Sequence, residues 1–214
     1  MADKTVNKLL NPYYYLAEYH NNGLDFVGNN LTPKDISLET IINEVSKYLL
    51  TLESDIDGFS VMSEYKKIAS VTWNTIENKG TRIIPDTASY LEKKFYNEFY
   101  DLINGQQSDL LINNLTDFEQ RVLYSELTIE EQKYLLISIN IAIGSYQYWL
   151  KQVNEYDKSP WKKFLTKESL EIKRGSLQDK DLVGAAIGGL IGGIFGAIVG
   201  GLSASIAAAV LDYT

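Results

Sequence analysis

A charge-free stretch near the carboxyl end restricts the fold of this chain more than any other feature. Residues 182–211 are thirty consecutive positions without a charged side chain, and eight of the fifteen glycines of the 214-residue chain fall within residues 184–201. As a straight helix this stretch would be about 45 Å long, which exceeds the roughly 30 Å hydrocarbon core of a bilayer. Its length therefore permits a membrane-spanning helix.

The glycines of this stretch have a helical period. Every fourth residue forms a ridge of Gly184, Gly188, Gly192, Gly196 and Gly200, and the neighbouring row of small residues adds Gly189, Gly193 and Gly201. Ridges of small residues let two helix backbones approach closely. We therefore predict that these eight glycines form a helix–helix or membrane interface, either as one glycine-zipper helix or as a hairpin with its bend at Gly192 and Gly193.

Glycine is a poor helix former, so the stretch needs a compensating environment. Eight glycines in a solvated helix cost on the order of 8 kcal/mol relative to alanine. Lipid, a second copy of the chain, or tight packing in the chain's own core would each supply compensation. The sequence leaves these environments open.

The remainder of the chain has the pattern of amphipathic helices separated by short breaks. We predict an all-α fold, a bundle of five to six helices in residues 1–180 followed by the glycine-zipper segment in residues 181–214. The predicted helices run from Pro12 to a glycine stop at Gly23, and from a Thr32 cap with Pro33 in the first turn to about residue 53. The later ones cover about 61–78, 85–104, 115–124 and 128–156, with a polar connection at 172–181.

The helix predicted at 128–156 has the clearest local signals. Thr128 and Glu131 have the spacing of a capping box, and no charged residue occurs between Lys133 and Lys151. A helix without charges over five turns is expected to be buried on most sides. We therefore expect it to be the central helix of the bundle.

Composition excludes several classes of function. The net charge of −8 and the lack of a basic cluster disfavour nucleic-acid binding, and the absence of cysteine excludes disulfides and thiolate metal sites. No phosphate-binding loop, nucleophile elbow or zinc-protease motif occurs, so we expect no enzyme activity, no catalytic residue and no cofactor. The first residues lack the apolar core of a secretion signal, which gives the expectation that none is present.

Two weaker candidates for chemistry remain. His20, the only histidine, is close in sequence to Glu18 and Asp25, and could act as a general base or a ligand, although a packing role at a helix end is the simpler interpretation. Residues 53–64 match part of a calcium-loop pattern, but Glu53 replaces the usual first aspartate. We therefore predict no metal site.

Two phrases of the sequence resemble an uncharacterised family of Bacteroidetes proteins. The first phrase contains Asn11, Pro12, Glu18, His20, Asn21, Gly23 and Asp25, and the second runs from about Ser138 to Trp161. Many members of that family look like exported lipoproteins. The resemblance implies a mostly helical domain, a bacterial source and the cell envelope, with no established activity.

These observations lead to one expectation about function and two alternatives. We expect a non-enzymatic, membrane-associated protein of the bacterial cell envelope whose glycine-zipper tail binds membrane lipid or another copy of itself. One alternative is a bacteriocin-like or pore-forming protein. The other is a soluble, cytoplasmic binding or hydrolytic protein that buries the zipper in its own core.

Overall fold

The computed structural model describes residues 10–34, 36–52, 67–72, 84, 87–104 and 110–210. Within the last helix, the surroundings of residues 172–179, 182–183, 186–187 and 189–195 are not described. The fold is all-α, as predicted, and the described residues contain no strand. The α-helices are α1 (Leu16–Asn30), α2 (Leu38–Leu50), α4 (Tyr90–Asn104), α5 (Leu110–Leu123), α6 (Ile129–Asn154) and α7 (Lys167–Val210). Two short 3₁₀ helices, η1 (Tyr156–Lys158) and η2 (Pro160–Lys163), connect α6 to α7.

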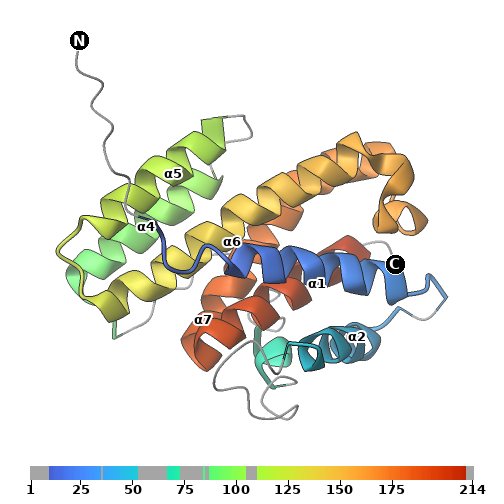
Figure 1. Ribbon diagram of the computed structural model, residues 1–214, viewed down its shortest axis with the longest axis horizontal. Helices are drawn as coiled ribbons and strands as arrows, with labels where there is room; N and C mark the ends of the chain where they lie inside the picture. The colour runs from blue at the N-terminus through green and yellow to red at the C-terminus, as the bar shows by residue number, and fades with distance from the viewer. Residues whose placement is uncertain are drawn as a thin grey trace.

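Helix α6 is the central element of the fold, and it runs diagonally through the molecule in Figure 1. One apolar cluster lies between α6 and the pair α4 and α5, and includes Phe99 and Phe118 with stacked rings. A second cluster joins α6 to α1, α2 and α7, and includes Trp149 and Trp161. The prediction that the charge-free helix is central and buried is thus confirmed, because α6 contributes buried residues to both clusters.

The capping box at the start of α6 is formed as predicted. The Thr128 hydroxyl accepts a hydrogen bond from the Glu131 backbone N–H, and the Glu131 carboxylate accepts one from the Thr128 backbone N–H. The same carboxylate also contacts the Thr128 hydroxyl at 2.9 Å and the side chain of Ser89, which lies at the start of α4. These hydrogen bonds lower the pKa of Glu131. The cap therefore also links the starts of α4 and α6.

Helix α7 doubles back on itself between Gly188 and Gly196. In a straight helix Gly184 and Gly200 would be about 24 Å apart. In the fold, a Cβ atom added to Gly184 would overlap the carbonyl oxygen of Gly200, and one added to Gly188 would overlap that of Gly196. The two arms of α7 therefore lie antiparallel and in backbone contact, as a helical hairpin.

The second arm of the hairpin is enclosed by the rest of the chain. Every residue from 196 to 210 is buried. Ile198, Leu202 and Ile206 belong to the same cluster as the buried side chains of α1, α2 and α6. Helix α7 also continues without a break through residues 180 and 181.

Several predicted helix boundaries were wrong, including the start of α5, which lies at Leu110 and not at about residue 115. Helix α1 continues through Gly23 to Asn30, because a Cβ at Gly23 would lie 2.6 Å from Leu202 and the glycine serves this close approach instead of a stop. Helix α2 begins after Ser37, whose hydroxyl accepts from the Thr40 N–H, and not after Thr32. Residues 172–181 are helical and not a connection, because they form part of the first arm of α7. Most of the helix predicted at 61–78 lies outside the described residues.

Candidate functional site: a buried polar cluster at the base of the hairpin

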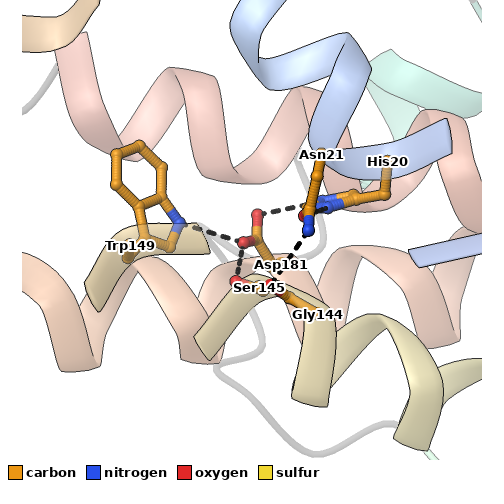
Figure 2. Close-up of polar contacts among 6 residues, drawn as sticks. All are labelled: His20, Asn21, Gly144, Ser145, Trp149 and Asp181. Atoms are coloured by element: carbon orange, nitrogen blue, oxygen red, sulfur yellow. Dashed lines mark hydrogen bonds and ion pairs between the residues drawn. The ribbon is translucent and has the colours of Figure 1, made fainter. Parts of the chain in front are cut away.

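A cluster of buried polar side chains lies where α1, α6 and the first arm of α7 meet. Figure 2 shows Asp181 of α7 between His20 of α1 and the pair Ser145 and Trp149 of α6. His20 Nε2 lies 3.5 Å from Asp181 Oδ1, and both side chains are fully buried. Three helices thus meet at a single carboxylate.

The second oxygen of Asp181 is held from α6. Asp181 Oδ2 accepts a hydrogen bond from the Ser145 hydroxyl and a second one, at 3.2 Å, from the Trp149 indole N–H. Ser145 and Trp149 are four residues apart and therefore lie on the same face of α6. This face of α6 fixes the position of Asp181 and, with it, the start of the charge-free segment.

His20 is oriented by its neighbour in the sequence. Asn21 donates through Nδ2 to the Gly144 carbonyl at 3.1 Å, which leaves Asn21 Oδ1 facing His20 Nδ1, also at 3.1 Å. An amide oxygen only accepts, so a hydrogen bond here requires a proton on Nδ1. The unshared electron pair of a neutral ring would then face the Asp181 carboxylate. An attractive contact between Nε2 and Oδ1 requires a further proton, on one atom or the other.

The electrostatic balance of the cluster is incomplete. His20 Nε2 and Asp181 Oδ1 have no hydrogen-bond partner, and the 3.5 Å between them exceeds the usual length of a charge-assisted hydrogen bond. Removing a charge from water without full compensation is costly. The cluster is therefore a destabilising element that the surrounding apolar packing holds in place, and it lies beside the hairpin: a Cβ at Gly201 would be 3.1 Å from the His20 ring.

The arrangement does not have the order of a hydrolytic triad. In such a triad the serine hydrogen-bonds to the histidine, and the carboxylate orients the histidine. Here the Ser145 hydroxyl donates to Asp181, and Ser145, His20 and Asp181 are all fully buried. The cluster therefore serves as a buried polar contact among α1, α6 and α7.

A second polar network joins α1 to the end of α6. The Trp161 indole N–H donates to the Tyr148 hydroxyl at 2.7 Å, and the Tyr148 hydroxyl donates to Asp25 Oδ1 at 2.9 Å. Burial, followed by the nearby Asp25 carboxylate, raises the pKa of Tyr148 well above its ordinary value. The network fixes Asp25 at the edge of the fold by way of two buried aromatic rings.

The other residues of the N-terminal phrase lie in the segment before α1 and along α1 itself. Asn11 donates to Glu119 at 2.7 Å and to the Leu136 carbonyl at 2.9 Å, so it attaches the segment before α1 to α5 and α6. Pro12 and Glu18 are exposed, and Glu18 is therefore no partner for the buried His20. The phrase serves mainly to fix α1 across α6 and α7.

Four of the eight zipper glycines contact each other within the chain, namely Gly184 with Gly200 and Gly188 with Gly196. Gly201 lies against His20, and the surroundings of Gly189, Gly192 and Gly193 are outside those described. In the described fold, the glycine ridge therefore has the chain's own second arm as its partner helix.

Sequence reasoning missed Asp181, Ser145 and Trp149. A signal for Asp181 was present, because it is the last charge before the charge-free stretch and lies three residues before Gly184 on the same helical face. The partners of Asp181 carried no such signal. A serine and a tryptophan on an uncharged helix look like ordinary core residues until the hairpin is in place.

One sequence candidate for a metal site remains, the partial calcium-loop pattern. Residues 53–64 lie outside the described part of the chain. Among the described residues, no group of three or more acidic or histidine side chains is placed to hold a metal ion.

Comparison of the chain with protein-family models, with curated proteins and with solved structures finds no match. Within the described ranges, no helix is both long enough and apolar enough to cross a membrane.

Proposed function

We propose that this chain is a non-enzymatic helical protein that stores a charge-free glycine hairpin in its core. Release of the hairpin would present it to membrane lipid or to a second copy of the chain. The carrying observation is the hairpin itself: its arms touch through Gly184 and Gly200, and residues 196–210 are wholly covered. A bacterial envelope location is part of this proposal.

The length of the hairpin supports release followed by straightening. Residues 182–191 of the first arm span about 15 Å, half of the hydrocarbon thickness, whereas residues 182–210 in one straight helix span about 44 Å. The glycine ridge that now meets the second arm would be free after straightening. It could then pack against the same ridge of another copy.

The polar cluster supports storage in a form that can open. The contact between His20 and Asp181 connects α1 to the base of the hairpin, and its incomplete hydrogen bonding makes this connection weaker than apolar packing of the same size would be. Separation of this pair would break the polar link between α1 and α7. Opening would then move α1 away from the hairpin.

The non-enzymatic part of the proposal rests on access. His20, the only histidine of the chain, is fully buried, and its carboxylate partner Asp181 is buried with it. A general base must reach the proton that it removes from a substrate. In the closed fold His20 cannot do so.

A single introduced thiol tests the proposal. The chain has no cysteine, and the Ser205 hydroxyl is buried on the second arm without a hydrogen-bond partner, so Ser205→Cys is a mild replacement. The variant is mixed with vesicles of phosphatidylethanolamine and phosphatidylglycerol, floated on a density gradient, and treated with an apolar or a charged maleimide. Asn154→Cys, at an exposed end of α6, is the matched control.

The proposal expects the thiol of the Ser205→Cys variant to be protected from both reagents in buffer, and to react with only the apolar reagent in the floated fraction. The thiol of the Asn154→Cys control should react with the charged reagent throughout. If the chain also releases dye from the same vesicles, the hairpin permeabilises the membrane. If the chain binds the vesicles without releasing dye, the hairpin anchors the protein to the membrane. A chain that does not float and stays monomeric after its core is loosened by His20→Leu contradicts the proposal.

A further inference from the structure

A small cleft at the junction of α1 and the end of α6 has the features of a ligand site. Its volume is about 280 Å³, and it is lined by Asp25, Asn29, Lys151, Gln152, Glu155, Lys158, Ser159 and Pro160. Seven of these eight residues are polar or charged. Known small-molecule sites have volumes of about 300–1,000 Å³, so this cleft suits a very small ligand.

One nearly buried side chain in the cleft has no hydrogen-bond partner in the described part of the chain. Gln152 is only 5% exposed, and its carboxamide makes no hydrogen bond to the described part of the chain. The amide atoms are not fully buried, so they remain accessible from the cleft. The cleft is the side from which a ligand can supply a hydrogen-bond partner.

The carboxylate of Asp25 is held in a fixed position in the cleft wall. It accepts from the Tyr148 hydroxyl, which accepts in turn from the Trp161 indole, and Trp161 is fully buried. A charged group held by a buried network loses little entropy when it binds a ligand. The negative ends of the α1 and α6 dipoles lie nearby, since both helices end beside the cleft. This wall favours a cation.

The opposite charge is present at the outer side of the cleft. Lys151 and Lys158 are exposed, and neither forms an ion pair in the described structure. Lys162 and Lys163, by contrast, have hydrogen-bond acceptors, because they donate to the backbone carbonyls of Asp157 and Asn29. The ammonium groups of Lys151 and Lys158 outnumber the one exposed carboxylate that lines the cleft beside them, Glu155, and so remain to bind an anion.

From these features we infer that the cleft binds a small zwitterion, an amino acid or a dipeptide. The ligand's ammonium group contacts Asp25 and its carboxylate contacts Lys151 and Lys158. Gln152 hydrogen-bonds to the ligand between the two charges. This site is separate from the glycine hairpin and does not depend on the function proposed for it.

Isothermal titration of the full chain with glycylglycine tests this inference. N-acetylglycylglycine lacks the ammonium group and glycylglycinamide lacks the carboxylate, so these peptides report each end separately. We expect saturable binding of glycylglycine and at least about tenfold weaker binding of both capped peptides.

Variants locate the binding. Asp25→Asn keeps an oxygen that accepts from Tyr148, and should weaken glycylglycine at least about tenfold while leaving the weak N-acetylated peptide unchanged. The double variant Lys151→Gln and Lys158→Gln changes only exposed side chains. It should weaken the binding of glycylglycine at least about tenfold and leave the weak binding of glycylglycinamide unchanged. Asp157→Asn and Lys162→Gln are matched controls outside the cleft.

Several results would overturn the inference. These are no saturable binding of glycylglycine at millimolar concentration, equal binding of the capped and free peptides, and equal effects of the control and cleft variants. The exposed lysine variants keep the test decisive even if Asp25→Asn were to unfold the chain.

Discussion

His20 of α1 and Asp181 of α7 lie 3.5 Å apart and are both fully buried, although 160 residues separate them in the sequence. The contact ties the N-terminal helix to the base of the glycine hairpin. It does so with ionisable groups in a part of the core where apolar side chains would pack more favourably. The position of this pair suits a contact that breaks when α1 separates from the hairpin.

The pair predicts non-additive effects of mutation. His20→Leu or Asp181→Leu alone should lower the free energy of unfolding by about 3–5 kcal/mol, because each leaves the other partner buried without compensation. The double variant should be at least about 1 kcal/mol more stable than the sum of the single effects. Urea unfolding of the four chains provides this cycle, and additive effects would show that the two residues are not coupled.

Alanine substitutions at the glycines should differ according to their surroundings. Gly188→Ala places a methyl group on the Gly196 carbonyl, and should destabilise the fold by about 3 kcal/mol or more. Gly201→Ala meets the His20 ring at 3.1 Å and the Asp181 backbone carbonyl at 3.2 Å, which is tight but not the overlap found at Gly188, and alanine gains about 1 kcal/mol in helix propensity. Thermal unfolding should therefore rank Gly201→Ala far above Gly188→Ala. Equal melting temperatures would argue against the hairpin.

Stability should decrease at alkaline pH because of buried tyrosines. Burial raises the pKa values of Tyr48, Tyr96 and Tyr148 above their ordinary value of 10.0. The folded chain therefore keeps protons that the unfolded chain releases above about pH 10, so the stabilisation is complete below that pH and is lost as the pH rises.

Tyr148→Phe isolates one of these contributions. It should reduce the slope of unfolding free energy against pH above about pH 10, and it should cost about 1–3 kcal/mol at neutral pH because Trp161 loses its acceptor. Chemical denaturation from neutral to alkaline pH gives both quantities. Tyr156→Phe removes a part-buried hydroxyl bond to the Leu165 carbonyl and serves as the control. An unchanged alkaline slope in Tyr148→Phe would contradict the assignment.

Glu131 should stabilise the fold only while it is ionised. Hydrogen bonds from Ser89 and Thr128 lower its pKa below the ordinary 4.5, so its contribution is present above that pH and is lost as the pH falls through the lowered pKa. Glu131→Gln keeps the shape of the capping box but removes the charge. It should be less stable than the parent chain at neutral pH and equally stable in strong acid. If the stability difference between Glu131→Gln and the parent chain did not change with pH, the effect would come from the geometry of the side chain and not from its charge.

Local features of the sequence were sufficient to predict the all-α class and several elements. The spacing of Thr128 and Glu131 predicted the start of α6, because a capping box needs only four consecutive residues. The uncharged length of α6 predicted its central position. Boundaries failed where a tertiary contact overrode a local signal: Gly23 looks like a helix stop but lies within α1, where it provides room for Leu202.

The sequence by itself determined that the glycine segment needs a tightly packed partner, since the ridge of small residues and its cost in water are properties of the segment alone. Only the tertiary structure decided which partner it has. Gly184 meets Gly200 because the chain reverses between Gly188 and Gly196, and Asp181 meets His20, Ser145 and Trp149 because that reversal sets the hairpin between α1 and α6. The contacts of Asp181 join residues far apart in the chain, so no local pattern could have specified them, whereas the hairpin is one of the two arrangements that the glycine ridge itself predicted.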